Sequence, residues 1–167
     1  TSLIMAVYNE EAGDKAVQWI EKYCTHVKGE LGGKPFILED WQKDDIIRPL
    51  FGTLRDDGLR QYRQAYIEVP RKNGKSNLCA AIALYMLFAD GEPGAEIISA
   101  AGDRNQARIV FEIASAMCAN NPKLHGHGKV LRNSIHYKNS FYKAISAEAN
   151  TKHGFNAHAV ILDELHV

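Results

Sequence analysis

Hydrophobic positions in the first third of the chain follow a helical period. Between residues 14 and 27 they recur every three or four residues, and Asp14 is placed to cap that stretch. Glycine and proline at residues 32–35 then interrupt the pattern. A second helical stripe occupies residues 41–51, and Gly52 ends it. The pattern predicts two helices, each packed on one side, ahead of the rest of the domain.

In the rest of the chain, short apolar runs alternate with helical stretches. Runs of strand length occur at residues 66–69, 95–101 and 159–162, and the last of them is predicted to be buried. Helical periodicity occupies residues 75–88, which are rich in alanine, and a stretch that begins after Asp103 as its N-cap. This alternation predicts an α/β domain whose central sheet is mostly parallel and flanked by helices.

A small β-hairpin insertion is predicted before the last strand. Three short runs at residues 130–131, 135–137 and 141–145 are separated by the polar turns Arg-Asn-Ser and Lys-Asn-Ser. We therefore divide the chain into an N-terminal helical segment, residues 1–62, and an alternating core, residues 63–167.

The composition excludes several classes of protein. Of 167 residues, 46% are hydrophobic and 24% are charged, which is typical of a globular domain and not of a disordered or fibrous chain. Twenty basic residues balance twenty acidic ones, so a contact with nucleic acid would need a local basic patch. The most apolar stretch, residues 78–88, is shorter than the roughly 20 residues that span a bilayer, and we expect no membrane contact.

The strongest chemical signal is the sequence Val-Pro-Arg-Lys-Asn-Gly-Lys-Ser at residues 69–76, between a predicted strand and a predicted helix. Gly74, Lys75 and Ser76 match the phosphate-binding loop Gly-x-x-x-x-Gly-Lys-Ser/Thr, while Val69 replaces its first glycine. In such loops, backbone amides and the helix N-terminus surround the phosphates of a nucleotide. The lysine neutralises the β and γ oxygens, and the hydroxyl holds Mg²⁺. A solvated basic turn is the alternative interpretation.

A second signal follows the last predicted strand, which leads into Asp163 and Glu164. Ligands of parallel sheets bind at the carboxyl ends of the strands. Asp163 is therefore placed to support Mg²⁺, and Glu164 to accept a proton from water that attacks the γ-phosphate. Arg71 and Lys72 add two cations within the loop, and the guanidinium of Arg71 suits bidentate contact with phosphate.

Three strings together resemble the large terminase subunits of tailed bacteriophages. They are Pro-Arg-Lys-Asn-Gly-Lys-Ser at residues 70–76, Asp-Arg-Asn-Gln-Ala at residues 103–107 and Leu-Asp-Glu-Leu-His at residues 162–166, and residues 38–42 and 49–52 are similar to that family too. The resemblance implies a P-loop ATPase that threads viral DNA through a portal into an empty capsid. Complete members carry a nuclease domain of ribonuclease H type. Nothing here corresponds to it, so we expect the N-terminal ATPase part of a longer protein, ending after the strand that carries the acidic pair.

The resemblance also implies roles for individual residues. Glu164, Lys75 and Arg71 would be catalytic, and Ser76 and Asp163 would hold the Mg²⁺ that accompanies ATP. The nucleotide-binding residues would be Pro70, Arg71, Lys72, Asn73, Gly74, Lys75, Ser76, Asn77 and Gln42. Gln42 resembles the glutamine that reads adenine in related motors, because its amide can both donate and accept a hydrogen bond. Residues 1–62 would thus contribute to the adenine side, and the hydrolysis-triggering arginine is Arg71 or one from a neighbouring subunit.

The implied partners are double-stranded DNA, a portal protein and a small terminase subunit. The resemblance further implies a homo-oligomeric ring on the procapsid, in the cytoplasm of an infected bacterium. Two other interpretations stay open. Superfamily 2 helicases carry Asp-Glu-x-His, which residues 163–166 match, although their loops usually contain Gly-x-Gly-Lys. A nucleotide-binding assembly module that does not hydrolyse ATP is the second.

Overall fold

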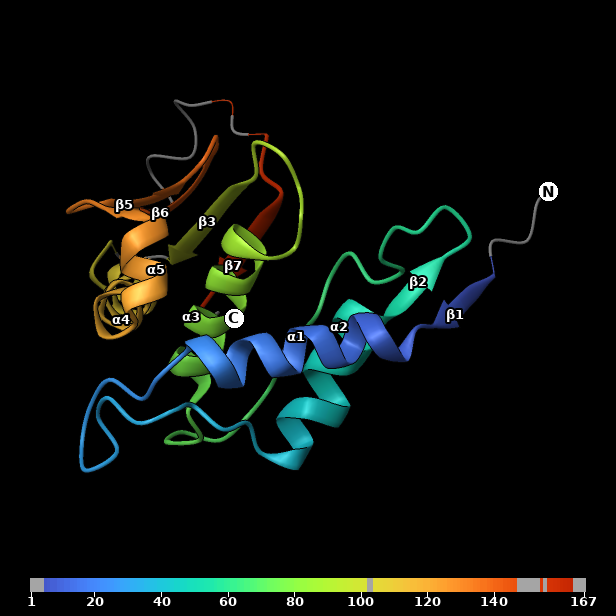
Figure 1. Ribbon diagram of the computed structural model, residues 1–167, viewed down its shortest axis with the longest axis horizontal. Helices are drawn as coiled ribbons and strands as arrows, with labels where there is room; N and C mark the ends of the chain where they lie inside the picture. The colour runs from blue at the N-terminus through green and yellow to red at the C-terminus, as the bar shows by residue number, and fades with distance from the viewer. Residues whose placement is uncertain (1–4, 102–103, 147–153, 155, 164–167) are drawn as a thin grey trace.

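The computed structural model describes residues 5–101, 104–146, 154 and 156–163. A mixed sheet with helices packed on it forms one part, and a helical N-terminal segment lies across α3 (Figure 1). In chain order the elements are β1 (Ala6–Tyr8), α1 (Glu10–Tyr23), the π-helix η1 (Gln42–Ile47), α2 (Arg48–Gly52), β2 (Thr53–Arg55), α3 (Lys75–Phe88), β3 (Glu96–Ala101), α4 (Arg104–Asn120), α5 (Pro122–His127), β4 (Lys129–Val130), β5 (Ser134–Tyr137), β6 (Ser140–Ser146) and β7 (Ala159–Leu162).

The main sheet has five strands in the order β4-β5-β6-β3-β7. β3 lies between two parallel neighbours, and its Ile97 is opposite Tyr142 of β6 and Ala159 of β7. β5 is antiparallel to both β4 and β6. The predicted hairpin strands exist, but they continue the central sheet, because β6 belongs to the hairpin and to the parallel part.

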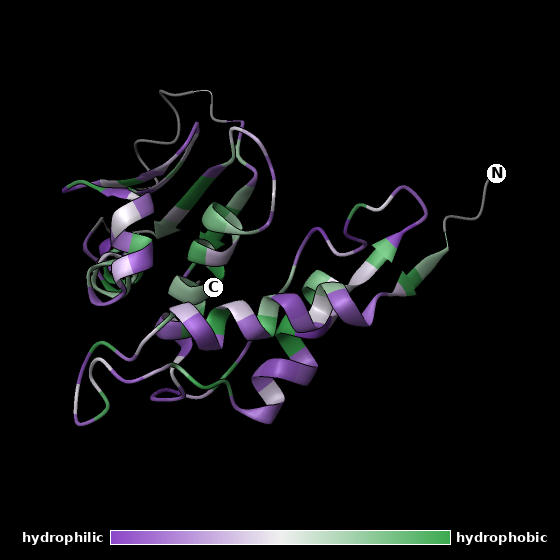
Figure 2. Cartoon of the chain, viewed as in Figure 1, coloured by the Kyte–Doolittle hydropathy of each residue, from purple (hydrophilic) through white to green (hydrophobic). Residues whose placement is uncertain are grey.

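Helix α3 occupies the centre of the core and begins and ends where the sequence predicts. It packs against α1, α4 and the strands β3, β6 and β7. Its Ala80, Ala81 and Ala83 are completely buried. Figure 2 shows the hydrophobic colour concentrated on α3 and β3. Side chains this small let neighbouring helices and strands approach closely, which explains the alanine-rich composition. None of the described helices is long and apolar enough to cross a membrane.

Helix α1 begins earlier than predicted. Its N-cap is Asn9, whose side chain accepts a backbone hydrogen bond of 2.9 Å, and Glu10 and Glu11 follow in the first turn. Carboxylates there interact favourably with the helix dipole. Asp14, the predicted cap, lies inside the helix and accepts a 2.9 Å hydrogen bond from Arg48 at the start of α2. The predicted start was wrong because Asn9 and Asp14 are both suitable capping residues, and only Asn9 is followed directly by two carboxylates in the first turn.

The second predicted helix forms as η1 followed by α2, packed tightly on α1. A Cβ added to Gly52 would lie 3.2 Å from the Cα of Gly13 and 2.6 Å from the ring of Tyr8. Only glycine fits this approach. Tyr8 belongs to β1, which pairs antiparallel with β2, and the sequence analysis missed this small sheet because its strands are three residues long and far apart in the chain.

Two strand predictions need correction. Residues 66–69 form no strand: Tyr66 is 77% exposed, and β7 pairs with β3 alone among the described strands. A strand requires a partner, which four β-prone residues cannot supply. β7 exists as predicted but is not fully buried on either face: Val160 and Leu162 are about half exposed, and Ala159 and Ile161 are partly buried. The predicted helix cap Asp103 lies outside the described residues.

A contact between Asp90 and His158 fixes the start of β7. Asp90, just after α3, accepts a 2.5 Å hydrogen bond from Arg60 and lies 2.9 Å from the ring nitrogen of His158, immediately before β7. Its side chain is 11% exposed. Burial alone would raise the pKa of Asp90, but the hydrogen bonds and charges of His158 and Arg60 together lower it below its usual value.

We expect Asp90→Ala to lower the free energy of unfolding by about 2 kcal/mol at pH 7, because it leaves the partly buried guanidinium of Arg60 and the ring nitrogen of His158 without their carboxylate partner. Since the folded-state pKa is lowered, this contribution is complete above the usual value of 3.8 and is lost as pH falls through the folded-state pKa. Urea unfolding at several pH values tests both points. Glu112→Ala, which removes an exposed pair with Arg108, is the control and should cost less than about 0.5 kcal/mol. An Asp90→Ala effect that does not shrink at low pH would contradict this account.

Candidate nucleotide-binding site

The predicted phosphate-binding loop forms an exposed turn at the N-terminus of α3. Its Asn73 donates a 3.1 Å hydrogen bond to the carbonyl of Pro70, which closes the turn. Lys72 and Gly74 both have positive φ, 67° and 71°, and Gly74 is the N-cap of α3. A non-glycine residue in this region is strained, and such strain is characteristic of functional loops. The first backbone amides of α3 have no carbonyl partner within the helix, so they point toward a ligand position in front of it.

Asp163 contacts this loop although it lies 87 residues after Ser76 in the sequence. Parallel pairing of β7 with β3 places the residue after Leu162 at the carboxyl edge of the sheet. There its carboxylate is only 7% exposed, and Oδ1 lies 2.9 Å from Nζ of Lys75. Ser76 donates a 3.4 Å hydrogen bond to Oδ2. The structure therefore brings together three residues that the sequence analysis selected on two distant segments.

The electrostatics at this point favour a cation beside Asp163. Oδ1 is fully buried and accepts no well-directed hydrogen bond among the described residues, so its contact with Lys75 is an ion pair. Burial and then the charge of Asp163 raise the pKa of the nearby Cys79 thiol to about 12, although Lys75 opposes this shift. Cys79 is therefore a protonated packing residue and not a nucleophile. A carboxylate oxygen without a hydrogen bond beside a serine hydroxyl fits Mg²⁺, which prefers oxygen ligands.

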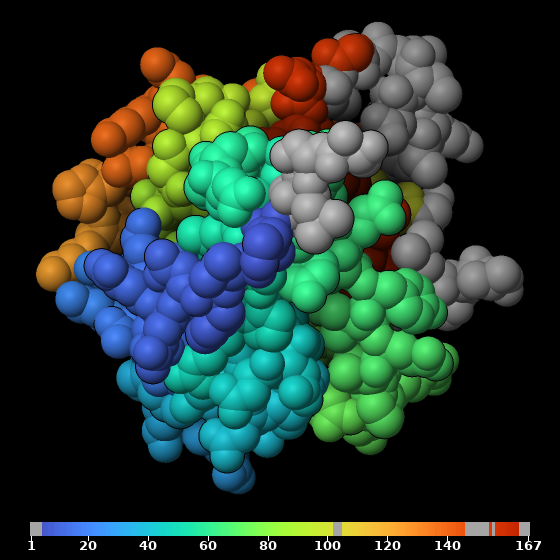
Figure 3. All heavy atoms as spheres, turned by 90° about the vertical axis from the view of Figure 1, so that its right-hand side faces the viewer, coloured from blue at the N-terminus to red at the C-terminus, as the bar shows by residue number. Residues whose placement is uncertain are grey.

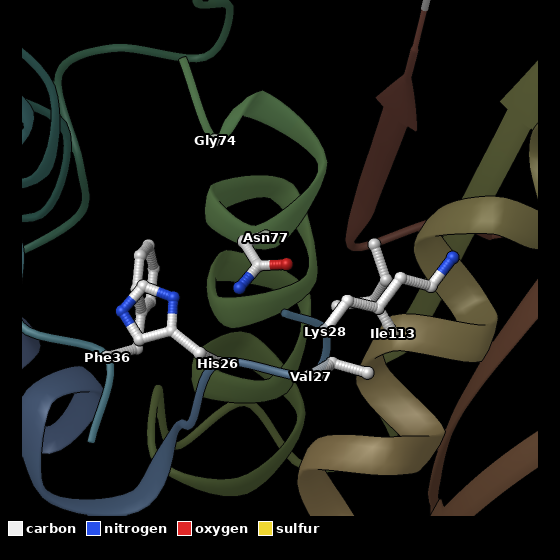
Figure 4. Close-up of a pocket in the computed structure, with 7 residues that line it drawn as sticks. All are labelled: His26, Val27, Lys28, Phe36, Gly74, Asn77 and Ile113. Carbon is white, nitrogen blue, oxygen red and sulfur yellow. The ribbon is translucent and has the colours of Figure 1, made fainter. Parts of the chain in front are cut away.

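A pocket of about 210 Å³ adjoins the loop on another side of α3, and it is lined by His26, Val27, Lys28, Phe36, Gly74, Asn77 and Ile113. Figure 4 shows His26 and Phe36 on one side of α3, Ile113 of α4 on the other, and Asn77 between them. The rings of His26 and Phe36 pack edge to face, with their centres 5.2 Å apart. Sequence reasoning missed His26, because a single histidine beyond the end of a helix carries no recognisable pattern.

Comparison with known proteins agrees with this geometry. The model of the family described as terminase large subunit, ATPase domain, matches residues 40–167. The chain belongs to this family. It is 35% identical over 159 residues to the large terminase subunit of Enterobacteria phage HK97, an alignment that covers 91% of this chain and 30% of that protein. The crystal structure of the HK97 large terminase matches with a TM-score of 0.76 and 32% identity, over 90% of this chain and 30% of that one.

The P-loop NTPase fold predicted from the sequence is therefore confirmed as that of a terminase ATPase domain. The chain spans 30% of the length of the HK97 relative. Figure 3 shows the N-terminal segment, blue to cyan, beside the green residues that lead into the phosphate loop. The N-terminal segment also borders the pocket, through His26 and Phe36.

The remaining predicted residues of this terminase domain have different placements. Arg71 and Lys72 lie on the exposed loop. Gln42 is 3% exposed, and its Oε1 accepts a 2.9 Å hydrogen bond from the amide of Glu39, so this oxygen stabilises the start of η1. Gln42 is not among the residues that line the pocket, and its role toward adenine stays a prediction. Glu164, the predicted catalytic carboxylate, lies outside the described residues.

Proposed function

We propose that this domain hydrolyses Mg-ATP and that the complete protein uses this hydrolysis to move double-stranded DNA into a procapsid. The convergence of Lys75, Ser76 and Asp163 at the N-terminus of α3 carries the proposal, since the last two are 87 residues apart in sequence. Membership of the terminase family supports it. With it we propose the other implied features: a portal protein and a small terminase subunit as partners, a ring of identical subunits on the procapsid, and the cytoplasm of an infected bacterium as the location.

ATP binding would begin with an exchange of partners at Lys75. Its ammonium is paired with Asp163 and is about one third exposed, so it can turn toward an incoming phosphate. The β- and γ-phosphates carry more negative charge than one carboxylate, and the amides at the start of α3 hold them as well. Asp163 and Ser76 would then hold Mg²⁺, whose contribution is to neutralise phosphate charge.

Hydrolysis would use the acid that follows Asp163 in the chain. The oxygen of a water molecule would attack the γ-phosphorus while Glu164 accepts a proton from that water. The bond between the γ-phosphorus and the ADP oxygen would break, which yields ADP and inorganic phosphate. Arg71, on the exposed loop, would stabilise the charge on the γ-phosphate in cis. An arginine from a neighbouring subunit would be the alternative.

The pocket beside Asn77 would take the nucleoside half of ATP. Loop amides hold the α- and β-phosphates, so the nucleoside continues past the first turn of α3. Gly74 and Asn77 of that turn line the pocket, and the ring of His26 offers a face for a purine. This location supports the proposal that residues 1–62 contribute to the adenine side.

Lys75→Ala should weaken Mg-ATP binding by about 10- to 150-fold, the effect of losing a charged hydrogen-bonding partner of phosphate. Isothermal titration calorimetry on this chain measures it, with Lys34→Ala, an exposed lysine on the N-terminal segment, as the matched control. Equal affinities for the wild type and Lys75→Ala would exclude this loop as the phosphate site.

Glu164→Gln should keep ATP binding but lower kcat for hydrolysis by about 10²- to 10⁴-fold, because the amide cannot accept the proton. Single-turnover hydrolysis and DNA packaging by the complete protein measure the effect, with the exposed Glu112→Gln as control. Normal packaging by Glu164→Gln would exclude the hydrolytic mechanism and favour an assembly module.

His26→Ala should weaken ATP binding by up to about tenfold, the size of one ring contact, and leave the binding of inorganic tripolyphosphate unchanged. Calorimetry with both ligands separates the nucleoside from the phosphate contribution. His125→Ala, an exposed histidine on α5, is the control. Equal losses for ATP and tripolyphosphate would place His26 on the phosphate side instead.

A further inference from the structure

One region of the chain carries positive charge without any acid. No aspartate or glutamate occurs between Glu112 and Glu148, and residues 121–146 contain five lysines and arginines together with three histidines. We call residues 121–146 the basic lobe; it comprises α5, β4, β5 and β6. Because the whole chain has 20 basic and 20 acidic residues, the other residues hold 15 basic and 20 acidic ones. The neutral total therefore conceals an excess of five positive charges in one place.

Most of these cations face solvent. Lys123, Lys129, Arg132 and Lys138 are exposed, and none of them pairs with a carboxylate among the described residues. Lys138 and Lys143 each lie over an aromatic ring, with the ammonium 5.3 Å from the ring centre of Tyr137 and 4.4 Å from that of Phe141. Lys143 differs in that its side chain is partly buried. Exposed cations that no carboxylate neutralises are available to an external anion.

The hairpins hold these charges in fixed relative positions. Lys129 is opposite His136 in the ladder of β4 and β5, Arg132 lies in the turn between those strands, and Lys138 lies in the turn at the other end of β5. A strand of four residues is about 13 Å long. The duplex presents about one phosphate charge per 1.7 Å of its axis, so it carries about eight charges over that length. In Figure 1 the basic lobe lies at the opposite end of the molecule from β1 and β2.

The conformation of Lys138 is a second, independent observation. It has φ of 52° in the two-residue turn between β5 and β6, a position that favours glycine or asparagine. Among the described non-glycine residues, only Lys72 of the phosphate loop shares a positive φ. A strained conformation of a lysine at a hairpin tip marks this position for a test of function.

We propose that the basic lobe contacts the phosphate backbone of duplex DNA, with Lys129, Arg132 and Lys138 as the principal contacts. This rests on the proposed function and names where the domain holds the DNA that it moves. A rigid polyanion matches cations fixed at both ends of a short strand, whereas an acidic peptide would have to become ordered to reach them. Contacts with phosphates alone are independent of base sequence.

The test compares two triple variants of the complete protein. Lys129→Gln, Arg132→Gln and Lys138→Gln remove three charges from the basic lobe. Lys22→Gln, Lys34→Gln and Arg63→Gln remove three exposed charges elsewhere. Fluorescence anisotropy with a short duplex of random sequence, at about 50 to 200 mM salt, gives affinity and salt dependence. The lobe variant should bind at least about tenfold more weakly, with a slope of log affinity against log salt reduced by about 2.7, or 0.9 per contact. The control variant should match the wild type.

Two further measurements separate folding and the proposed ATPase from this contact. Lys138→Gly should weaken DNA binding without lowering the urea midpoint, because glycine accepts the positive φ. Basal ATP hydrolysis should be the same in the wild type and both triple variants. Its absence in all three proteins would contradict the proposed ATP hydrolysis but not the proposed DNA contact. Three results would overturn the DNA contact: no binding of duplex by the wild type at low salt, equal losses in both triple variants, or a lobe variant that loses binding to polyglutamate and not to DNA.

Discussion

The ion pair between Lys75 and Asp163 joins the two segments on which the rest of the site depends. A carboxylate that is only 7% exposed requires a cation, and the lysine at the start of α3 supplies it. At the other end of the same two elements, Asp90 follows α3 and contacts His158, which precedes β7. Helix and strand therefore run antiparallel, with a contact to a carboxylate at each end. The alanine-rich face of α3 permits this arrangement, because larger side chains would separate the helix from the sheet.

The two contacts differ in what a nucleotide would do to them. The Lys75 contact lies at the predicted phosphate loop, where an incoming phosphate would compete for the same ammonium. The Asp90 contact lies at the far end of α3 and shares no residue with the loop. If one end exchanges partners while the other holds, β7 keeps its register and the change is confined to the site. Asp163 could then change partners without losing its position, as the proposed binding of Mg²⁺ would require.

Local sequence patterns predicted the elements that a single continuous stretch of residues specifies. α3 was predictable because an apolar run follows Gly74, and β3 because its residues form a continuous, nearly apolar run. Residue types and order along the chain predicted that the loop and Asp163 belong to one site, and the two are in contact, while their roles toward phosphate and Mg²⁺ stay predictions. Residues 66–69 failed as a strand because pairing is non-local, and β1 was missed for the same reason. The pocket at His26 depends on which distant segments meet beside α3, which no local pattern encodes.

The net charge of zero does not predict whether this chain binds a polyanion, because such binding depends on where the charges lie. The sheet connects the basic lobe to the residues around Asp163. β5, β6, β3 and β7 are successive neighbours, so the basic lobe and the strand that precedes Asp163 belong to one hydrogen-bonded sheet. Lysine and arginine contacts with phosphate are individually weak, screened by salt and equivalent at every step along a duplex. A protein that moves DNA, as we propose for the complete protein, would need contacts of that kind, since contacts that read bases would hold some positions more tightly than others. The proposed nucleotide site, where the buried Asp163 meets the loop, and the proposed exposed surface for the polymer would answer these different demands.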